Sequence, residues 1–147
     1  MRHEITGEPR PAFRKVTFDE VPVNRHRGGE LRTLLGPGNT GATSGFMGHA
    51  HLEPGEYISE HYHPYSEEFV YVLSGTVVLR LDGEEIEVSG QEGILVPINV
   101  RHRLENRSGA PVELVYHLGP LAPRPDLGHV DTEDVPRPEL SPAGEPR

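Results

Sequence analysis

The dipeptide Asp82-Gly83 stands between two short apolar runs, T-V-V-L-R-L before it and E-E-I-E-V after it. Asp-Gly between such runs is a strong signal for a two-residue β-hairpin, because both turn positions adopt positive φ. Leu79 in the first run and Ile86 in the second are placed to share one buried face. The pattern therefore predicts a pair of antiparallel strands.

Short apolar runs separated by Gly, Pro, Asn and Asp continue along most of the chain. No segment shows a convincing helical period, so the predicted fold class is all-β, a β-sandwich or barrel. The strand candidates are residues 13–18, 31–35, 44–52, 57–63, 68–73, 76–81, 84–88, 94–96, 101–105 and 112–118.

The 147 residues are expected to form one domain with a tail. Residues 1–12 are predicted to be an N-terminal arm and residues 13–119 a single domain. From Pro120 to Arg147 the composition changes, because seven of the fifteen prolines fall there. Proline cannot sit in a central strand, so residues 120–147 are predicted to be an extended, Pro-rich tail that wraps the domain or a partner, or stays disordered.

The charge and the cysteine count exclude several kinds of partner and site. The net charge is −9, which repels nucleic acid and anionic membrane surfaces. There is no cysteine, so disulfides and thiolate sites are excluded. The N-terminus has no apolar signal-peptide core and no run approaches a membrane span, so a cytoplasmic location is expected.

Residues 36–41 read G-P-G-N-T-G and match the dinucleotide-binding pattern G-x-G-x-x-G. That pattern binds a pyrophosphate only when a helix begins directly after the loop. The sequence that follows contains Gly45 and Gly48 and forms helices poorly. We therefore interpret this stretch as a turn that leads into a strand, and expect no nucleotide cofactor.

The stretch 55–75 contains a possible metal half-site. His61 and His63 are two residues apart, so both imidazoles face the same way if the segment is a strand. Glu68 follows a turn and begins the returning strand. Two imidazoles and a carboxylate can bind a metal with nitrogen and oxygen ligands.

The spacing Gly55-x5-His61-x-His63-x4-Glu68-x6-Gly75 resembles the first sequence motif of the cupin family. The segment Pro97-x4-His102-x3-Asn106 resembles the second, with Asn99 where cupins usually carry glycine and with Gly90 one residue out of step. The resemblance covers residues 40–118. It implies a double-stranded β-helix, a jelly-roll barrel of two antiparallel sheets, with His61, His63, Glu68 and His102 as metal ligands.

Three further histidines compete for a place at this site. If residues 101–105 and 112–118 form a hairpin with its turn near Ser108, Val115 pairs with His102 and His117 lies on the same face. His117 is then either a fourth imidazole that displaces Glu68 or a catalytic acid/base. His49 and His51 share a face of the preceding strand and are weaker candidates for the fourth ligand. His3, His26 and His129 fall in expected loops or tails and receive no role.

A second resemblance concerns residues 27–32, 41–48 and 60–69, which are similar to the single-domain cupin polyketide cyclases of bacterial aromatic (type II) pathways. It implies a metal-dependent cyclase that closes a ring by aldol chemistry in a poly-β-keto chain. The metal would act as a Lewis acid on an enolate or carbonyl oxygen inside an apolar pocket. Because side chains alternate between the two faces of a strand, only some of the candidate wall residues can face the pocket. These candidates are Phe46, Met47, Tyr57, Tyr71, Val96, Leu104 and Tyr116.

Zinc is the expected metal because cyclisation involves no redox change, and iron, nickel and manganese are the alternatives. The alternative functions are an iron-dependent dioxygenase of an aromatic substrate and a non-catalytic, metal-stabilised binding protein. Beyond the polyketide substrate, the expected partner is a second copy of the chain in a homodimer, since most cupins associate through their sheets.

Overall fold

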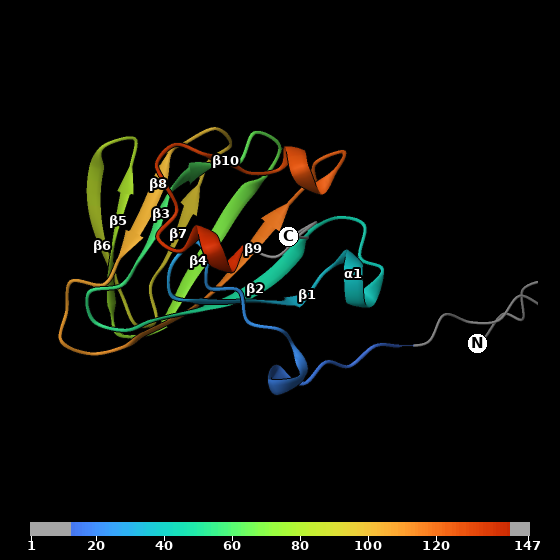
Figure 1. Cartoon of the computed structure of the whole chain (residues 1–147), viewed down its shortest axis with the longest axis horizontal. Coiled ribbons are helices and arrows are strands. Elements are labelled where there is room, and N and C mark those ends of the chain that lie inside the picture. The colour runs from blue at the N-terminus through green and yellow to red at the C-terminus, as the bar shows by residue number, and fades with distance from the viewer. Residues whose placement is uncertain (1–12, 142–147) are drawn as a thin grey trace, which may run out of the picture.

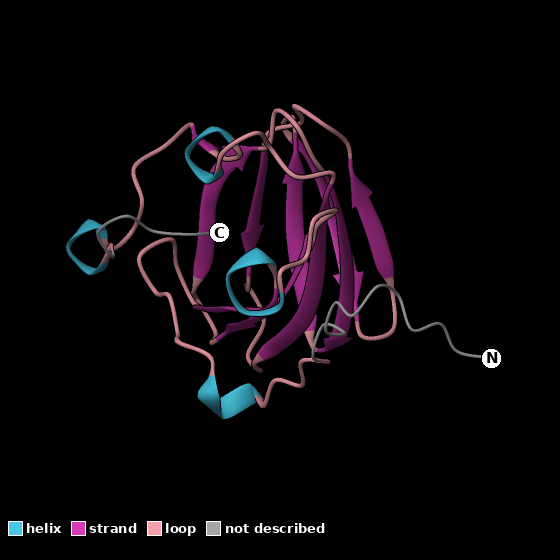
Figure 2. Ribbon diagram, turned by 90° about the vertical axis from the view of Figure 1, so that its right-hand side faces the viewer, coloured by secondary structure: helices cyan, strands magenta, loops and turns pink. Residues whose placement is uncertain are grey.

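Two antiparallel five-stranded sheets pack face to face around a common apolar core in the computed structural model, which describes residues 13–141 (Figures 1 and 2). The predicted all-β fold is therefore confirmed. The predicted N-terminal arm and the last six residues of the tail lie outside the described range. No helix within residues 13–141 is long and apolar enough to cross a membrane.

The first sheet contains, in spatial order, β1 (Glu30–Leu35), β2 (Phe46–Leu52), β9 (Val112–Gly119), β4 (Glu67–Ser74) and β7 (Gly93–Val96). The second contains β10 (Val130–Asp131), β3 (Tyr57–Tyr62), β8 (His102–Glu105), β5 (Thr76–Leu81) and β6 (Glu84–Ser89). Short helical turns complete the described part: η1 (Phe18–Glu20), α1 (Pro37–Thr40), η2 (Pro125–Leu127) and η3 (Pro138–Leu140).

The β5–β6 hairpin forms as its turn residues predicted. Asp82 has φ of 48° and Gly83 of 89°, and Leu79 pairs with Ile86. Side chains from both sheets then fill the core, among them Leu52 and Leu114 from the first sheet and Leu79 from the second, all fully buried. Burial of these aliphatic groups supplies the main stabilisation, at about 25 cal/mol for each Å² of apolar surface removed from water.

Two local expectations are wrong. No strand forms in residues 13–18, because their apolar residues do not alternate; the chain instead turns at η1, where the Thr17 amide donates to Glu20 Oε1 at 2.8 Å. The expected hairpin of residues 101–105 with 112–118 is absent as well. β8 pairs with β3 and β5 in one sheet, whereas β9 pairs with β2 and β4 in the other. The turn after Asn106 therefore crosses between the sheets.

The G-P-G-N-T-G stretch forms the single helical turn α1, which ends at Gly41 with φ of 75°. The chain then enters β2 at Phe46. Asn99, in the place where cupins usually carry glycine, has φ of 70°, so asparagine meets the same backbone requirement.

Residues 120–141, here called the C-terminal strap, return across the second sheet and add β10 to its edge beside β3 (orange to red in Figure 1). Glu133 anchors the strap, because its Oε2 accepts hydrogen bonds from Arg103 Nε at 2.9 Å and from the Glu60 amide at 2.6 Å. Thr132 adds a bond from its amide to the Glu60 carbonyl at 3.0 Å. The strap therefore forms part of the wall around the site described next.

Candidate metal centre

The four side chains that the sequence singled out converge at one point between the sheets. His61 on β3 and His102 on β8 are cross-strand partners in the second sheet, while Glu68 on β4 reaches them from the first. His63 lies directly after β3. Ligand atoms of all four lie within 4.8 Å of one another, and all four side chains are buried, from 0% exposed for His102 to 7% for Glu68.

An irregularity in β3 turns His61, and His63 just after the strand, inward. The pairing of β3 with β8 shifts register between Ile58 and His61. Strict alternation from the buried Ile58 would direct Glu60 and Tyr62 inward; the extra residue of a bulge shifts this phase by one. His61 and His63 are thereby buried, whereas Glu60 and Tyr62 are only partly buried.

Each histidine ring is held through Nδ1 by a backbone carbonyl. The bonds run from His61 to Ser59 at 2.7 Å, from His63 to Gly128 at 2.9 Å and from His102 to Val100 at 2.9 Å. A carbonyl oxygen can only accept, so each Nδ1 carries the proton, and in the neutral ring Nε2 presents a lone pair. A hydrogen bond from the nitrogen that faces away from the metal is typical of metal-binding histidines, since it fixes the tautomer and the ring orientation.

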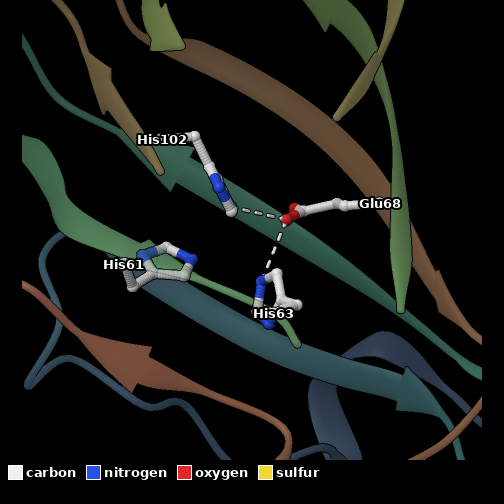
Figure 3. A group of neighbouring side chains, drawn as sticks. All are labelled: His61, His63, Glu68 and His102. Atoms are coloured by element: carbon white, nitrogen blue, oxygen red, sulfur yellow. Dashed lines mark hydrogen bonds and ion pairs between the residues drawn. The ribbon is translucent and has the colours of Figure 1, made fainter. Parts of the chain in front are cut away.

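The carboxylate of Glu68 lies between two of these rings, with Oε1 at 2.9 Å from His102 Nε2 and 3.2 Å from His63 Nε2 (Figure 3). Lone pairs on nitrogen and oxygen at such distances repel each other unless a cation or a proton lies between them. Three neutral imidazoles and one carboxylate also form a donor set that zinc and other first-row divalent metals accept. The side chains present therefore fit a divalent metal.

Burial and charge shape the titration of these groups. Burial strongly lowers the pKa of His61, and the neighbouring histidines lower it further. Burial alone would raise the pKa of Glu68, but in the metal-free protein the hydrogen bonds that His102 and His63 donate from protonated Nε2 atoms hold it well below its usual range. Burial opposes protonation of His102 too, yet its bond with Glu68 leaves its pKa raised. The carboxylate therefore stays ionised and ready to neutralise a cation.

His129, which received no role from the sequence, lies beside this group. The strap places its ring parallel to that of His61, with centroids 4.3 Å apart and planes 12° apart. Its Nε2 donates to Asp131 Oδ1 at 2.8 Å, and burial lowers its pKa to about 4. The local sequence carries no signal for this position, because the β10–β3 pairing that creates it joins residues almost 70 positions apart.

A cavity of about 580 Å³ opens next to the four residues. Its walls are largely apolar, with polar groups of Arg27, Tyr116 and His129 among them. This volume lies within the range of small-molecule sites, about 300–1,000 Å³. Among the candidate wall residues, Phe46, Leu104 and Tyr116 line the cavity. Val96 is buried in the core instead. Met47 and Tyr71 border a shallow hollow on the outer face of the first sheet.

His117 does not approach the metal centre, so its expected position is wrong. Its cross-strand partner is Phe69 on β4, and it is exposed on the outer face of the first sheet. Glu68 instead pairs with Leu118, one residue further along β9, whose side chain points inward. The expectation failed because it required β9 to pair with β8.

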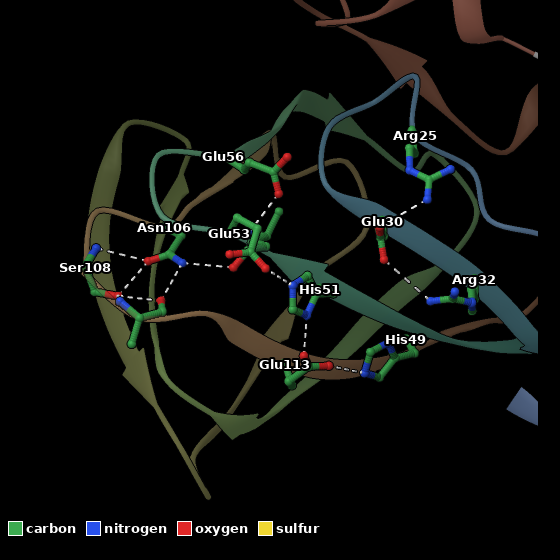
Figure 4. Close-up of polar contacts among 12 residues, drawn as sticks. Arg25, Glu30, Arg32, His49, His51, Glu53, Glu56, Asn106, Ser108 and Glu113 are labelled. Carbon is green, nitrogen blue, oxygen red and sulfur yellow. Dashed lines mark hydrogen bonds and ion pairs between the residues drawn. The ribbon is translucent and has the colours of Figure 1, made fainter. Parts of the chain in front are cut away.

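His49 and His51 also face away from the centre, toward the outer side of β2 (Figure 4). His49 Nε2 lies 2.7 Å from Glu113 Oε1, and His51 bridges Glu113 and Glu53, with Nε2 at 2.5 Å from Glu53 Oε2. These contacts join β2 to β9. Of the candidates for the fourth ligand, the structure therefore brings only Glu68 to the three clustered histidines.

Comparisons with known proteins agree with this architecture. The family model described as "Cupin domain" matches residues 48–118. Protein SchB of Streptomyces halstedii is 58% identical over 131 residues, which cover 89% of this chain and 94% of SchB. Polyketide synthase CurC of Streptomyces cyaneus is 57% identical over 120 residues, or 82% of this chain and 78% of CurC.

Among solved structures, that of the polyketide cyclase RemF from Streptomyces resistomycificus superposes with a TM-score of 0.67. The match covers 86% of this chain and 90% of RemF at 20% sequence identity. At that identity, the similarity concerns the fold.

Proposed function

This chain belongs to the cupin family, and we propose that it is a metal-dependent polyketide cyclase that closes a ring by aldol-type condensation in a poly-β-keto chain. CurC, which is named as a polyketide synthase protein, supports the substrate class, since it is 57% identical to this chain over 82% of its length. Fold alone would not, because cupin-type barrels carry many chemistries.

One observation carries the proposal: a buried set of three imidazoles and a carboxylate lies at an apolar cavity large enough for a multi-ring substrate. His61, His63, Glu68 and His102 would hold the metal. A bound divalent ion supplies Lewis acidity toward a carbonyl or enolate oxygen. Zinc is proposed because the reaction involves no redox change.

The rest of the chain supplies shape and orientation. Phe46, Leu104 and Leu118 line the cavity and exclude water from the reacting carbons, which brings them together in a restricted space. His129 closes the metal end. Because its Nε2 proton is held by Asp131, its Nδ1 is left as a hydrogen-bond acceptor for a substrate hydroxyl.

The proposal is tested with protein purified without a histidine tag. Metal analysis should find about one divalent ion per chain. The protein is then added to a ketosynthase and acyl carrier protein that make a poly-β-keto chain in situ, and products are separated by liquid chromatography and mass spectrometry. We expect the wild-type protein to increase the yield of one ring-closed product. His61→Ala should lose this activity by more than about 100-fold, because loss of a residue that only hydrogen-bonds to a metal ligand already costs about 10- to 100-fold.

The same assay without oxygen separates the alternatives. Undiminished turnover by the zinc-loaded protein in the absence of oxygen supports cyclisation and excludes a dioxygenase. Turnover that requires iron and consumes oxygen contradicts the proposal. A protein that binds zinc, loses stability in His61→Ala and changes no polyketide product is instead a metal-stabilised binding protein.

We also propose a homodimer. Four large apolar side chains are exposed on the outer face of β4 and β7, namely Phe69, Tyr71, Leu73 and Leu95. Monomeric proteins rarely leave extended apolar patches uncovered. If a second copy packs on this face, light scattering at micromolar concentration should give the mass of a dimer for the wild type and of a monomer for Phe69→Lys. A monomeric wild-type protein would contradict the proposal.

A further inference from the structure

Tyr116 is the aromatic residue of β9 that faces the cavity. It lies between Leu114 and Leu118, both buried, and alternation gives all three the same inward direction. Its cross-strand neighbours are Gly48 on β2 and Val70 on β4. The phenol is therefore carried by the central strand of the first sheet, a rigid position.

Gly48 leaves the space that the phenol occupies. A Cβ atom at residue 48 would lie 2.3 Å from Tyr116 Cζ and 2.4 Å from its hydroxyl oxygen. Real Cβ atoms do not approach other atoms so closely. The ring of Tyr116 therefore lies across β2, over the one position in that part of the strand where a side chain is missing.

The hydroxyl of Tyr116 makes no hydrogen bond to any residue within the described range, and this partly buried side chain lines the cavity. A few polar groups in a largely apolar pocket usually fix the orientation of a ligand, so this unused donor at the cavity wall is available to one. Burial, reinforced by the charge of Glu68, raises the pKa of Tyr116 above its usual value. The phenol is therefore a neutral donor at any physiological pH.

The distance to the metal centre follows from the strand register. Glu68 pairs with Leu118 and Val70 pairs with Tyr116, so Tyr116 and Glu68 are diagonal neighbours on one face of adjacent strands. Such side chains start about 7–8 Å apart. A donor and a metal centre are thus held at two separate points of one cavity.

We propose that Tyr116 is a second oxygen-binding point of the substrate cavity, which donates a hydrogen bond from its hydroxyl to a carbonyl or enol oxygen of the substrate. The metal centre holds another oxygen of the same molecule. The substrate class, an apolar chain or ring system with oxygens at separated carbons, rests on the proposed function. Two fixed points determine which carbons meet, so Tyr116 contributes to the choice of ring.

The test compares 9-fluorenone with fluorene, two tricyclic probes that differ by a carbonyl oxygen. Their binding to zinc-loaded protein is measured by titration, and the absence of tryptophan keeps the protein's own fluorescence weak. Tyr116→Phe removes only the hydroxyl. We expect it to bind fluorenone about 3- to 10-fold more weakly than the wild type, the worth of one hydrogen bond, and to bind fluorene equally well.

Tyr71→Phe is the matched control, because Tyr71 lies on the neighbouring strand β4 but is exposed on the outer face. It should bind both probes as the wild type does. Gly48→Ala displaces the phenol instead of truncating it and should also weaken fluorenone binding; its thermal unfolding and zinc content show whether it is folded. Tyr116→Phe itself should retain the zinc content of the wild type.

The proposal is overturned if Tyr116→Phe binds fluorenone as tightly as the wild type, if it loses affinity for both probes alike, or if the wild type binds neither. Its failure is distinguishable from failure of the proposed function. A wild-type protein that closes rings, with Tyr116→Phe unchanged toward fluorenone, refutes only the role of Tyr116. A protein that binds fluorenone through Tyr116 but closes no ring refutes the cyclase.

Discussion

Replacing Glu68 by glutamine isolates the part of the metal centre that carries negative charge. The side chain keeps its length, and its amide can donate to the Nε2 atoms of His63 and His102, which lie 3.2 and 2.9 Å from Oε1. The fold should therefore survive. What the variant loses is the anionic oxygen that neutralises the cation.

The expected effect follows from linkage. A ligand that binds only the folded state at 100 times its Kd raises the free energy of unfolding by about 2.7 kcal/mol. A chain of this length gains about 4 °C in Tm for each kcal/mol, so zinc at that concentration should raise the wild-type Tm by about 10 °C. Loss of a ligand should weaken zinc binding by about 100-fold or more, since outer-shell partners alone are worth 10- to 100-fold. At the same zinc concentration the gain then falls to about 0.4 kcal/mol, or about 2 °C.

The assay is thermal unfolding followed by circular dichroism, with and without zinc after chelator treatment. Without metal, Glu68→Gln should unfold at or slightly below the Tm of the wild type, because the hydrogen bonds with His63 and His102 stabilise the ionised carboxylate in the folded state. Glu67→Gln is the matched control, since Glu67 is the preceding residue of β4 and does not belong to the four-residue group. It should keep the full zinc-dependent rise.

Two results would refute the reasoning about Glu68. One is a Glu68→Gln variant that keeps the 10 °C rise, which would mean that the histidines alone bind the metal. The other is a Glu67→Gln variant that loses the rise as well, which would show a general effect of charge on zinc binding. A metal-free Glu68→Gln protein that is unfolded would contradict the claim that the amide fits the site.

Three further predictions concern other parts of the chain. The hydrogen bond to Glu53 raises the pKa of His51, so the stabilisation from protonated His51 is complete below the unfolded pKa near 6.5 and disappears as the pH rises through the folded value. In urea unfolding, His51→Gln should therefore lower the free energy of unfolding more at pH 6 than at pH 9, and the reverse order would contradict this prediction. Leu79→Ala should lower the free energy of unfolding by about 2–5 kcal/mol, whereas Leu35→Ala, at an exposed position, should change it by less than about 0.5 kcal/mol in the same experiment. His117→Ala should bind zinc within about twofold of the wild type in calorimetric titration, and a tenfold loss would place His117 near the metal after all.

Local patterns predicted much of the fold because they depend on neighbours in the chain. The Asp82-Gly83 turn required only positive φ at two adjacent residues, and the structure has it. Alternation predicted that His61 and His63 share a face, which they do, although a bulge in β3 decided that this face is the inner one. That bulge left no recognisable mark in the sequence.

Sequence alone therefore determined the all-β class, most strand positions and, through motif spacing, the group of four residues whose side chains meet. Only the tertiary structure decided the pairings between distant strands. Because β9 joins β2 and β4 and not β8, His117 turns outward and Tyr116 faces the cavity. Because the strap pairs with β3, His129 stacks on His61. Alternation shows which residues of one strand share a face. Which strands pair depends on burying apolar surfaces that are far apart in the sequence, and no local pattern predicts that choice.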